Sequence, residues 1–290
     1  MKLPAPLYAY ARLARLDKPT GIWLLLFPAW WSQLLNTAHG GPVDAMLMLM
    51  FFIGSVAMRA AGCAVNDVLD RELDRKVART KTRPVASGEI SVAGALIFAG
   101  VMTLIGLAVV SQMGPLALIL AAASLPLVLI YPLMKRFTWW PQAFLGLTFN
   151  WGALVASAAL KNDITFPSLI LYAAGFFWTL GYDTVYAFQD AGDDVKAGIK
   201  STARLLGLNA RKWVGFWYGL FWILLVAAGL ATHMGIGFYV GMSLTLFEIA
   251  TLIRLWRMDD AHSSLGIFRA NTLLGWCVVF SFVAGLFSTL

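Results

Sequence analysis

Residues 46–74 read MLMLMFFIGSVAMRAAGCAVNDVLDRELD. The part from 46 to 66 is apolar and long enough to cross a bilayer as a helix, because such a span needs about 20 residues. Directly after it, carboxylates accumulate within about two helical turns. Ionisable groups in or beside a membrane are costly. These carboxylates therefore indicate a functional site at the end of a membrane helix.

Four residues make up this first acidic cluster: Asn66, Asp67, Asp70 and Asp74. Asn66, Asp70 and Asp74 follow one another at intervals of four and share one side of a helix, and we expect Asp67 on that side too. A helix C-terminus carries partial negative charge, so carboxylates gathered there need cations. The alternative is a solvated face on which Arg71, Arg75 and Lys76 neutralise them.

A second acidic cluster follows another apolar run. The run from about 167 to 189 leads into Asp190 and Asp194, which lie one helical turn apart. Hard divalent cations take oxygen ligands, and a diphosphate can be held through such cations. Two clusters facing each other would form such a site. The candidate Mg²⁺ ligands are thus Asn66, Asp67, Asp70, Asp74, Asp190 and Asp194.

The composition is that of a polytopic membrane protein. The chain has 290 residues, of which 60% are hydrophobic and 13% charged, with a mean hydropathy of +0.74; this excludes a soluble globular domain. We expect an all-α bundle of nine transmembrane helices, a single domain over 1–290, with cap loops at about 66–91 and 183–211. The nine apolar runs lie at about 20–38, 46–66, 92–112, 115–134, 141–160, 167–189, 212–232, 236–256 and 268–289.

Basic residues are concentrated on one side of this predicted bundle. Of the 22 Lys and Arg, all but Arg59 and Lys161 fall in the N-terminal segment or on alternate connections. The positive-inside rule then places the N-terminus and both acidic clusters on the cytoplasmic side. This asymmetry accounts for the net charge of +7 without a nucleic-acid partner.

Two polar residues lie deeper in the same apolar runs. Asp183 precedes Asp190 by seven residues, and Arg59 precedes Asn66 by seven, so each lies about 10 Å further in on the same side. Tyr186 continues the stripe from Asp183. Asp183 would orient or deprotonate a polar substrate, and the planar fork of Arg59 would receive a carboxylate. The alternatives are a helix-packing hydrogen bond for Asp183 and an ion pair between Arg59 and Asp183.

A departing diphosphate also needs cationic side chains. Arg136, which directly follows the sequence YPLMK at 131–135, is the strongest single candidate. The other candidates are Arg71, Lys81, Arg83, Lys135 and Lys200. Aromatic residues can shield and stabilise a cationic intermediate; the candidates are Phe149, Trp151, Phe177 and Trp178, with lipid or helix contact as the alternative for each.

Both acidic segments resemble signatures of the UbiA prenyltransferase superfamily. The first comprises RAAGCAVNDVLDRELD at 59–74 and RPVASG at 83–88. The second comprises YDT at 182–184, Asp190, DDVK at 193–196 and GIKST at 198–202. The resemblance covers nearly the whole chain and includes Tyr131-Pro132 and Lys135-Arg136.

This resemblance implies Mg²⁺-dependent transfer of a polyprenyl group from polyprenyl diphosphate to 4-hydroxybenzoate, at the ring carbon ortho to the hydroxyl, with release of diphosphate, in ubiquinone biosynthesis. It implies one magnesium-diphosphate site at Asn66, Asp70 and Asp74 and another at Asp190 with Asp194. Arg71 and Arg136 would match basic residues near the diphosphate, and Asp183 an acidic position near the aromatic acceptor. It also implies a bacterial inner membrane, contact with membrane lipid, and an association with other quinone-biosynthesis enzymes.

Three alternatives remain open at this point. A member of the same family can act on another acceptor, of the haem, naphthoate or homogentisate type. CDP-alcohol phosphotransferases also use membrane aspartates, but they have Asp-Gly and Ala-Arg after the first acid, whereas Arg71 follows Asp70 here. A cation-coupled transporter would place its acids near the midplane on broken helices, whereas these acids stand at helix ends.

Overall fold

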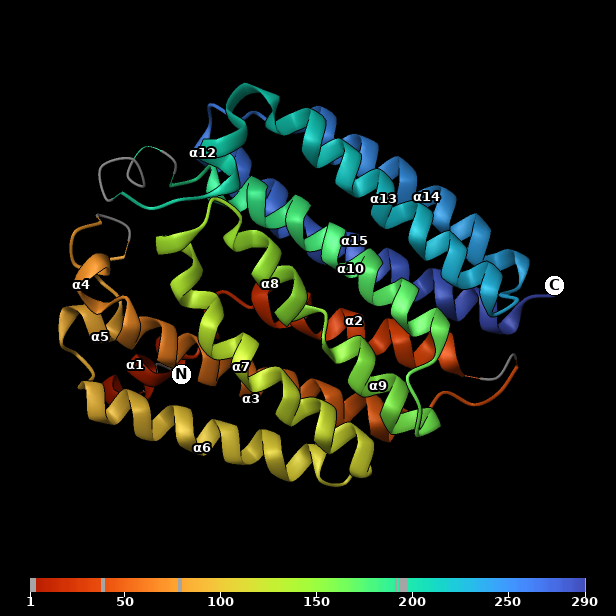
Figure 1. Cartoon of the computed structure of the whole chain (residues 1–290), viewed down its shortest axis with the longest axis horizontal. Helices are drawn as coiled ribbons and strands as arrows, with labels where there is room; N and C mark the ends of the chain where they lie inside the picture. Colours follow the sequence, from red (N-terminus) through yellow and green to blue (C-terminus); the bar gives the residue numbers. More distant parts are fainter. Residues whose placement is uncertain (1–3, 38–39, 78–79, 191, 193–197, 290) are drawn as a thin grey trace.

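The computed structural model describes residues 4–37, 40–77, 80–190, 192 and 198–289, and within these ranges all regular secondary structure is helical. The long helices lie side by side along the longest axis of the molecule (Figure 1). They are α2 (Thr20–Asn36), α3 (Ala45–Leu69), α6 (Val92–Val110), α7 (Pro115–Phe137), α10 (Phe166–Ala187), α13 (Ala210–Ala231), α14 (Ile236–Leu255) and α15 (Ala261–Phe287). The predicted all-α fold is confirmed.

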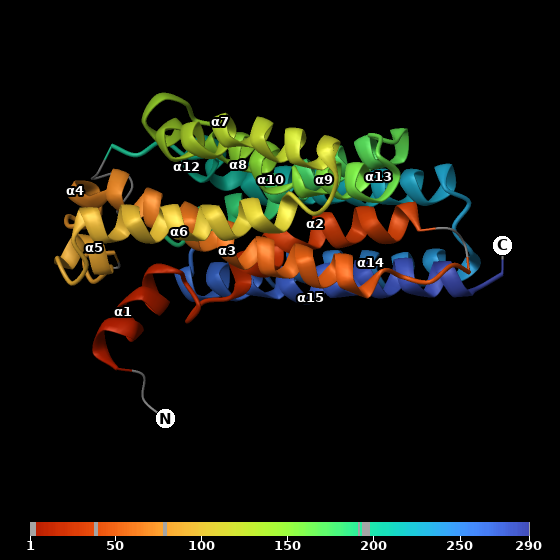
Figure 2. The ribbon, with the colours of Figure 1, turned by 90° about the horizontal axis from the view of Figure 1, so that it is seen from below.

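Short helices gather at one end of this bundle. We call it the basic end, after the Lys and Arg residues of the segments that contain these helices. The short helices are α4 (Arg71–Asp74), α5 (Pro84–Ser87) and α12 (Thr202–Leu206), which is followed by the 3-10 helix η1 (Gly207–Asn209). The C-terminus lies at the opposite end (Figure 1). At the basic end, α1 (Ala5–Leu13) projects away from the bundle (Figure 2). Both predicted acidic segments therefore reach the same end of the molecule.

Among the described residues, seven helical segments are long and apolar enough to cross a membrane: Ala45–Leu69, Val92–Val110, Pro115–Phe137, Pro141–Lys161, Thr202–Ala231, Ile236–Leu255 and Ala261–Phe287. The prediction of a multi-pass membrane protein is confirmed at this level. Two further predicted spans, 20–38 and 167–189, correspond to α2 and α10. However, α2 has only 17 residues, and α10 is not among the segments apolar enough to cross, so the count of nine is not established.

Helix boundaries follow local sequence signals. Asp44 accepts a hydrogen bond from Leu47 N (2.9 Å) at the start of α3, and Ser91 accepts one from Gly94 N (3.0 Å) at the start of α6; such caps satisfy amides that have no partner within the helix. Between α6 and α7, Gly114 has φ +95. That conformation suits glycine, and it permits the short reversal that leads into α7.

One predicted span is broken in the middle. The run at 141–160 forms α8 (Pro141–Phe149) and α9 (Gly152–Lys161), with Asn150 fully buried at the break. Asn150 Nδ2 donates to Gly146 O (2.8 Å) and to Thr179 Oγ1 (2.8 Å) on α10. Because backbone polar groups in a membrane need partners inside the protein, such contacts make a break in the helix tolerable.

Aromatic side chains fill the centre of the bundle between α2, α10 and α13. Trp31 and Trp178 are fully buried with ring centroids 4.8 Å apart, and Trp178 stacks on Phe221 at 5.7 Å. Trp178 therefore serves the core, which is the structural alternative to its predicted role beside a cation. This rigid core holds α10 in place, and α10 carries Asp183.

Candidate active site

Two adjoining hollows lie between the helices and meet near the basic end. The larger, which we call the inner chamber, has a volume of about 810 Å³, and the smaller, the acidic pocket, about 220 Å³. Both are lined by Asn66, Arg83, Tyr131, Pro132, Asp183 and Tyr186. The two hollows therefore meet at a common boundary of polar side chains.

The first acidic segment contributes one side of the acidic pocket. Helix α3 ends at Leu69, and Asp70 departs from helical geometry with φ −95 and ψ 4. The four-residue spacing nevertheless persists, because Asp70 N donates to Asn66 O (2.9 Å) and Asp74 N donates to Asp70 O (2.8 Å). Asn66, Asp70 and Asp74 all line the pocket. Their predicted common face is confirmed.

The structure corrects the prediction that Asp67 lies on the same side of the helix as Asn66. Asp67 lines neither hollow; it is fully buried and pairs with Arg15 Nη2 at 2.6 Å and Arg83 Nη1 at 3.3 Å. A step of one residue turns an α-helix by about 100°. Asp67 therefore cannot share the side of Asn66, and its neighbours are guanidinium groups instead of the pocket.

Two predicted cations converge on Asp70. Lys135 Nζ pairs with Asp70 Oδ2, while Arg136 Nη2 lies 3.6 Å from Asp70 Oδ1 and donates to Leu69 O (3.0 Å). Oδ1 of Asp70 is buried and has no hydrogen-bond partner among the described residues. A buried polar atom is normally paired, so this oxygen is available to an additional ligand.

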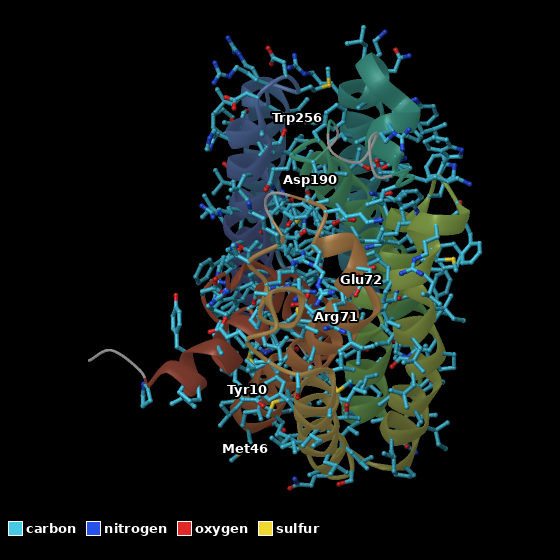
Figure 3. All side chains as sticks on the ribbon, turned by 90° about the vertical axis from the view of Figure 1, so that its left-hand side faces the viewer. Tyr10, Met46, Arg71, Glu72, Asp190 and Trp256 are labelled. Atoms are coloured by element: carbon cyan, nitrogen blue, oxygen red, sulfur yellow. The ribbon has the colours of Figure 1, made fainter. Side chains whose placement is uncertain are left out.

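Asp74 and the second acidic segment complete the pocket. Asp74 Oδ2 accepts a charged hydrogen bond from Arg83 Nη1 at 2.8 Å. Asp190, just beyond α10, lines the pocket together with Lys200, whose Nζ donates to Phe137 O (3.2 Å) at the end of α7. Viewed onto the basic end, the labelled Asp190 and the α4 residues Arg71 and Glu72 mark the two acidic segments (Figure 3).

Part of the predicted metal site lies outside the described residues, namely Asp194 and its neighbour Asp193. Within the described ranges, no three His, Cys, Asp or Glu side chains come close enough to form a ready-made metal cluster. The carboxylates that are described are partly occupied by Lys135 and Arg83. The Mg²⁺ ligand set therefore stays a prediction.

Three predicted basic residues do not line the hollows. The side chain of Arg71 is partly buried outside them, and that of Lys81 is exposed. Arg136 is 43% exposed and reaches the site only through Asp70 and Leu69. The structure thus brings Arg83, Lys135 and Lys200 to the acidic pocket and leaves Arg71 and Lys81 away from it.

Arg59 lies in the wall of the inner chamber. Its guanidinium carbon stands 5.3 Å above the Phe149 ring, and a Cβ on Gly21 would come within 2.7 Å of its Nε and Nη2. Among the described residues it forms no ion pair within 4 Å, with Asp183 or otherwise, and its Nε is buried without a hydrogen-bond partner. Arg59 and Asp183 therefore do not form a direct ion pair.

One part of the chamber wall is rich in hydroxyl groups. Asp183 and Tyr186 line it as predicted, together with Tyr131 and Tyr182. Of the aromatic candidates, Phe149 and Trp151 line the chamber, whereas Phe177 packs against the central core and does not. Sequence reasoning gave no role to Tyr182, although it adjoins Asp183 in the chain.

An apolar arm of the chamber extends between α3, α6, α7 and α9. Its lining includes Phe51 of α3, Met113 in the α6–α7 connection and Val155 of α9. Leu107 on α6 and Leu125 on α7 line the chamber while 50% and 41% exposed on the surface. The arm thus reaches the outer, lipid-facing surface between these two helices.

Residues 25–278 match the UbiA prenyltransferase family. The chain belongs to the UbiA prenyltransferase family. It is 42% identical over 287 residues to the mitochondrial 4-hydroxybenzoate polyprenyltransferase of Arabidopsis thaliana, covering 96% of this chain and 69% of that protein. It is 47% identical over 254 residues to 4-hydroxybenzoate geranyltransferase 1 of Lithospermum erythrorhizon, covering 86% and 81%. The mitochondrial 4-hydroxybenzoate polyprenyltransferase of Bos taurus is 40% identical over 285 residues, covering 97% and 76%.

Solved structures share the UbiA fold with this chain. The apo structure of a UbiA homolog from Aeropyrum pernix K1 has a TM-score of 0.73 at 24% identity, covering 91% of this chain and 96% of that one. A UbiA homolog from Archaeoglobus fulgidus bound to GPP and Mg²⁺ has a TM-score of 0.70 at 18% identity, covering 95% and 99%. At these identities the likeness concerns the fold.

The expected location in a bacterial inner membrane is corrected by these comparisons. The UbiA-family relatives from Arabidopsis thaliana, Aedes aegypti, Caenorhabditis elegans and Bos taurus are all named mitochondrial, which points to a mitochondrial membrane. Hydropathy and the distribution of basic residues report a hydrocarbon core and a sidedness. They do not distinguish one such membrane from another, so the sequence pattern could not have prevented this error.

Proposed function

We propose that this UbiA-family protein transfers a polyprenyl group from polyprenyl diphosphate to 4-hydroxybenzoate, at the ring carbon ortho to the hydroxyl, releasing diphosphate, in ubiquinone biosynthesis. The observation that carries the proposal is the junction of an acidic pocket with a chamber that contains Arg59, a buried cation without an ion pair among the described residues. Relatives 39–47% identical to the chain and named 4-hydroxybenzoate polyprenyl- or geranyltransferases support it.

The acidic pocket suits Mg²⁺ with a diphosphate. Asn66, Asp70 and Asp74 offer oxygen ligands on one side, and Oδ1 of Asp70, which accepts no hydrogen bond from the described residues, favours an added cation. Asp190 would contribute from the other side, together with Asp194. When bound, Mg²⁺ supplies charge neutralisation for the departing diphosphate.

Protein cations assist the same leaving group. Lys135 and Lys200 line the pocket, and Arg83 stands at its boundary with the chamber. Arg136 would act from beside Asp70. As the bond between diphosphate oxygen and prenyl carbon breaks, these side chains stabilise the growing negative charge. We leave Arg71 and Lys81 out of this set, because their side chains line neither hollow.

The inner chamber would hold the aromatic acceptor. Arg59 receives its carboxylate, while Asp183 and Tyr186 stand at the boundary with the acidic pocket and orient its hydroxyl end. The ring carbon ortho to that hydroxyl attacks the allylic cation, and Asp183 would accept the ring proton. Phe149 and Trp151 line the chamber, where aromatic side chains would exclude water and stabilise the cation.

The apolar arm would take the prenyl tail, and its opening beside Leu107 and Leu125 lets a long tail continue into lipid. We also propose that α2 and α10 cross the membrane with the seven other segments, which gives nine spans in one domain. Both helices pack in the centre of the bundle among those segments.

The test is an acceptor assay with the purified chain in lipid vesicles. With 4-hydroxybenzoate, a polyprenyl diphosphate and Mg²⁺ we expect diphosphate release and a C-prenylated acid. Turnover of a naphthoate or homogentisate but not of 4-hydroxybenzoate would move the protein within its family. Absence of prenyl transfer to any aromatic acceptor would refute the proposal. Asp163→Asn, an exposed carboxylate in the α9–α10 connection, is the matched control for Asp70→Asn.

A further inference from the structure

Tyr182 is held at the chamber wall by a chain of hydrogen bonds that the proposed reaction does not use. Asn150 Nδ2 donates to Thr179 Oγ1 (2.8 Å), and Thr179 Oγ1 donates to Tyr182 OH (3.1 Å). The Tyr182 ring is fixed from two sides, at centroid distances of 5.1 Å from Trp178 and 5.9 Å from Phe268. Tyr182 is only 1% exposed, yet it lines the inner chamber.

Which group donates in each of these hydrogen bonds follows from Asn150, the first residue of the series. Asn150 Nδ2 also faces the carbonyl of Gly146 at 2.8 Å, and a carbonyl only accepts, so the atom facing it must be the amide nitrogen. Thr179 Oγ1 therefore accepts a hydrogen bond from Asn150, and its own hydroxyl hydrogen is donated to Tyr182 OH. A Cβ on Gly175 would come within 2.0 Å of Asn150 Oδ1, so this glycine makes the room in which the amide is oriented.

The consequence is a hydroxyl with one proton to donate. Tyr182 OH accepts from Thr179, and a phenol has a single donor hydrogen. Within the described residues it makes no other hydrogen bond. A buried donor without an acceptor is costly in a membrane interior. The proton is thus available to a group inside the chamber.

Arg59 indicates which group that is. It lines the same chamber as Tyr182. Both residues also belong to the deep layer of the site, since Tyr182 precedes Asp190 by eight residues and Arg59 precedes Asn66 by seven, which is about 10–12 Å along a helix. An anion bound at Arg59 would offer Tyr182 an acceptor oxygen.

We propose that Tyr182 donates a hydrogen bond to the carboxylate of the aromatic acceptor bound at Arg59, and that Asn150 and Thr179 are positioning residues for this donor. The inference rests on the proposed prenyl transfer to 4-hydroxybenzoate. It assigns recognition of the acid group to two converging donors: one charged, on α3, and one neutral, on α10. A carboxylate gains more from Tyr182 than a neutral substituent does, because hydrogen bonds to charged groups are the stronger ones.

The experiment compares Tyr182→Phe with the unchanged protein in vesicles. We expect the KM for 4-hydroxybenzoate to rise about tenfold or more, with little change in the KM for the prenyl diphosphate. As competitive inhibitors, benzoate carries only the carboxylate and phenol only the hydroxyl. The Ki of benzoate should rise in parallel, whereas that of phenol should not change.

Two further variants separate positioning from structure. Thr179→Val should raise the KM for 4-hydroxybenzoate less than Tyr182→Phe does, and adding it to Tyr182→Phe should have no further effect. Tyr218→Phe is the matched control, because Tyr218 is a buried tyrosine bonded to Asn271 (3.0 Å) that lines neither hollow. It should leave both KM values unchanged.

The outcomes distinguish this inference from the proposed function. If the unchanged protein prenylates 4-hydroxybenzoate but Tyr182→Phe leaves the KM and the Ki of benzoate unaltered, the role of Tyr182 is refuted and the reaction stands. A rise in the Ki of phenol alone would also overturn it, because the hydroxyl would then lie at Tyr182. If Tyr182→Phe fails to fold, Thr179→Val with the two inhibitors provides the same test.

Discussion

Arg15 forms an ion pair with the fully buried Asp67, with Arg15 Nη2 2.6 Å from Asp67 Oδ1, although 52 residues separate them in the chain. Arg83 shares the same oxygen at 3.3 Å and reaches Asp74 Oδ2 at 2.8 Å. The N-terminal segment is thereby tied through Arg83 to a carboxylate of the acidic pocket. Arg15 adopts a positive φ of 59, which is uncommon for a residue other than glycine, and the ion pair stabilises that conformation.

Arg15→Gln should therefore destabilise the protein by about 2–3 kcal/mol, because Asp67 loses one of the two cations that compensate its burial. We expect a lower Tm in detergent and a higher KM for the prenyl diphosphate, since Arg83 is drawn from Asp74 towards Asp67. Arg257→Gln is the matched control: the Arg257 side chain is 71% exposed and pairs with Asp260, and such pairs are worth about 1 kcal/mol or less. Equal effects of both changes would contradict a special role for the Arg15–Asp67 pair.

Gly21→Ala should act on the acceptor site without unfolding the protein. The added Cβ would meet the guanidinium of Arg59 at 2.7 Å, and the flexible end of that side chain can move aside. Displacing a charged donor from a bound carboxylate should raise the KM for 4-hydroxybenzoate about tenfold or more.

Steady-state kinetics with varied acceptor, alongside thermal unfolding, check this expectation. Gly219→Ala is the control, because no atom lies within 4 Å of the Cβ it would add. An unchanged KM in Gly21→Ala would show that Arg59 does not contact the acceptor.

Sequence periodicity was sufficient for the helices and for one face of the acidic pocket. Apolar runs predicted the long helices to within three residues, because hydropathy reports what lipid requires. The exceptions are α15, which begins at Ala261 and not at 268, and the run at 141–160, which is divided into α8 and α9. The four-residue spacing of Asn66, Asp70 and Asp74 persisted even where α3 ends. It persisted because the backbone hydrogen bonds continue across Asp70.

Partners that lie far apart in the sequence could not be predicted from periodicity, because tertiary contacts determine them. Nothing near Arg15 in the sequence indicates that it will meet Asp67. The exposed fraction of Lys81 depends on the course of the 75–91 connection, which has no repeating pattern to read. The hydrogen bonds that link Asn150, Thr179 and Tyr182 connect the α8–α9 break with α10. Taken alone, each of these residues resembles an ordinary packing residue. Such partners become visible only when the helices are placed together.

Removal of divalent metal tests the acidic pocket. If Asp70 and Asp190 hold Mg²⁺ with the diphosphate, a chelator should abolish prenyl transfer and added Mg²⁺ should restore it. Asp70→Asn should lower kcat about a hundredfold or more, since removal of one group that stabilises leaving-group charge costs about this much. Diphosphate release is the measurement, with Asp163→Asn as control. Full activity in the chelated protein would exclude a metal-held diphosphate.

The opening between α6 and α7 predicts a dependence on donor length. Leu125 lines the chamber and is 41% exposed, whereas Leu129, one turn along α7, is 56% exposed and lines neither hollow. Leu125→Trp should therefore obstruct the path of a long prenyl tail, while Leu129→Trp changes only the lipid-facing surface. We expect Leu125→Trp to reduce kcat/KM for a polyprenyl diphosphate about tenfold relative to geranyl diphosphate, the loss expected from a displaced apolar contact of 1–3 kcal/mol. Competition between the two donors in one vesicle preparation measures this ratio directly, and an equal loss for both donors would show that the tail leaves the chamber by another path.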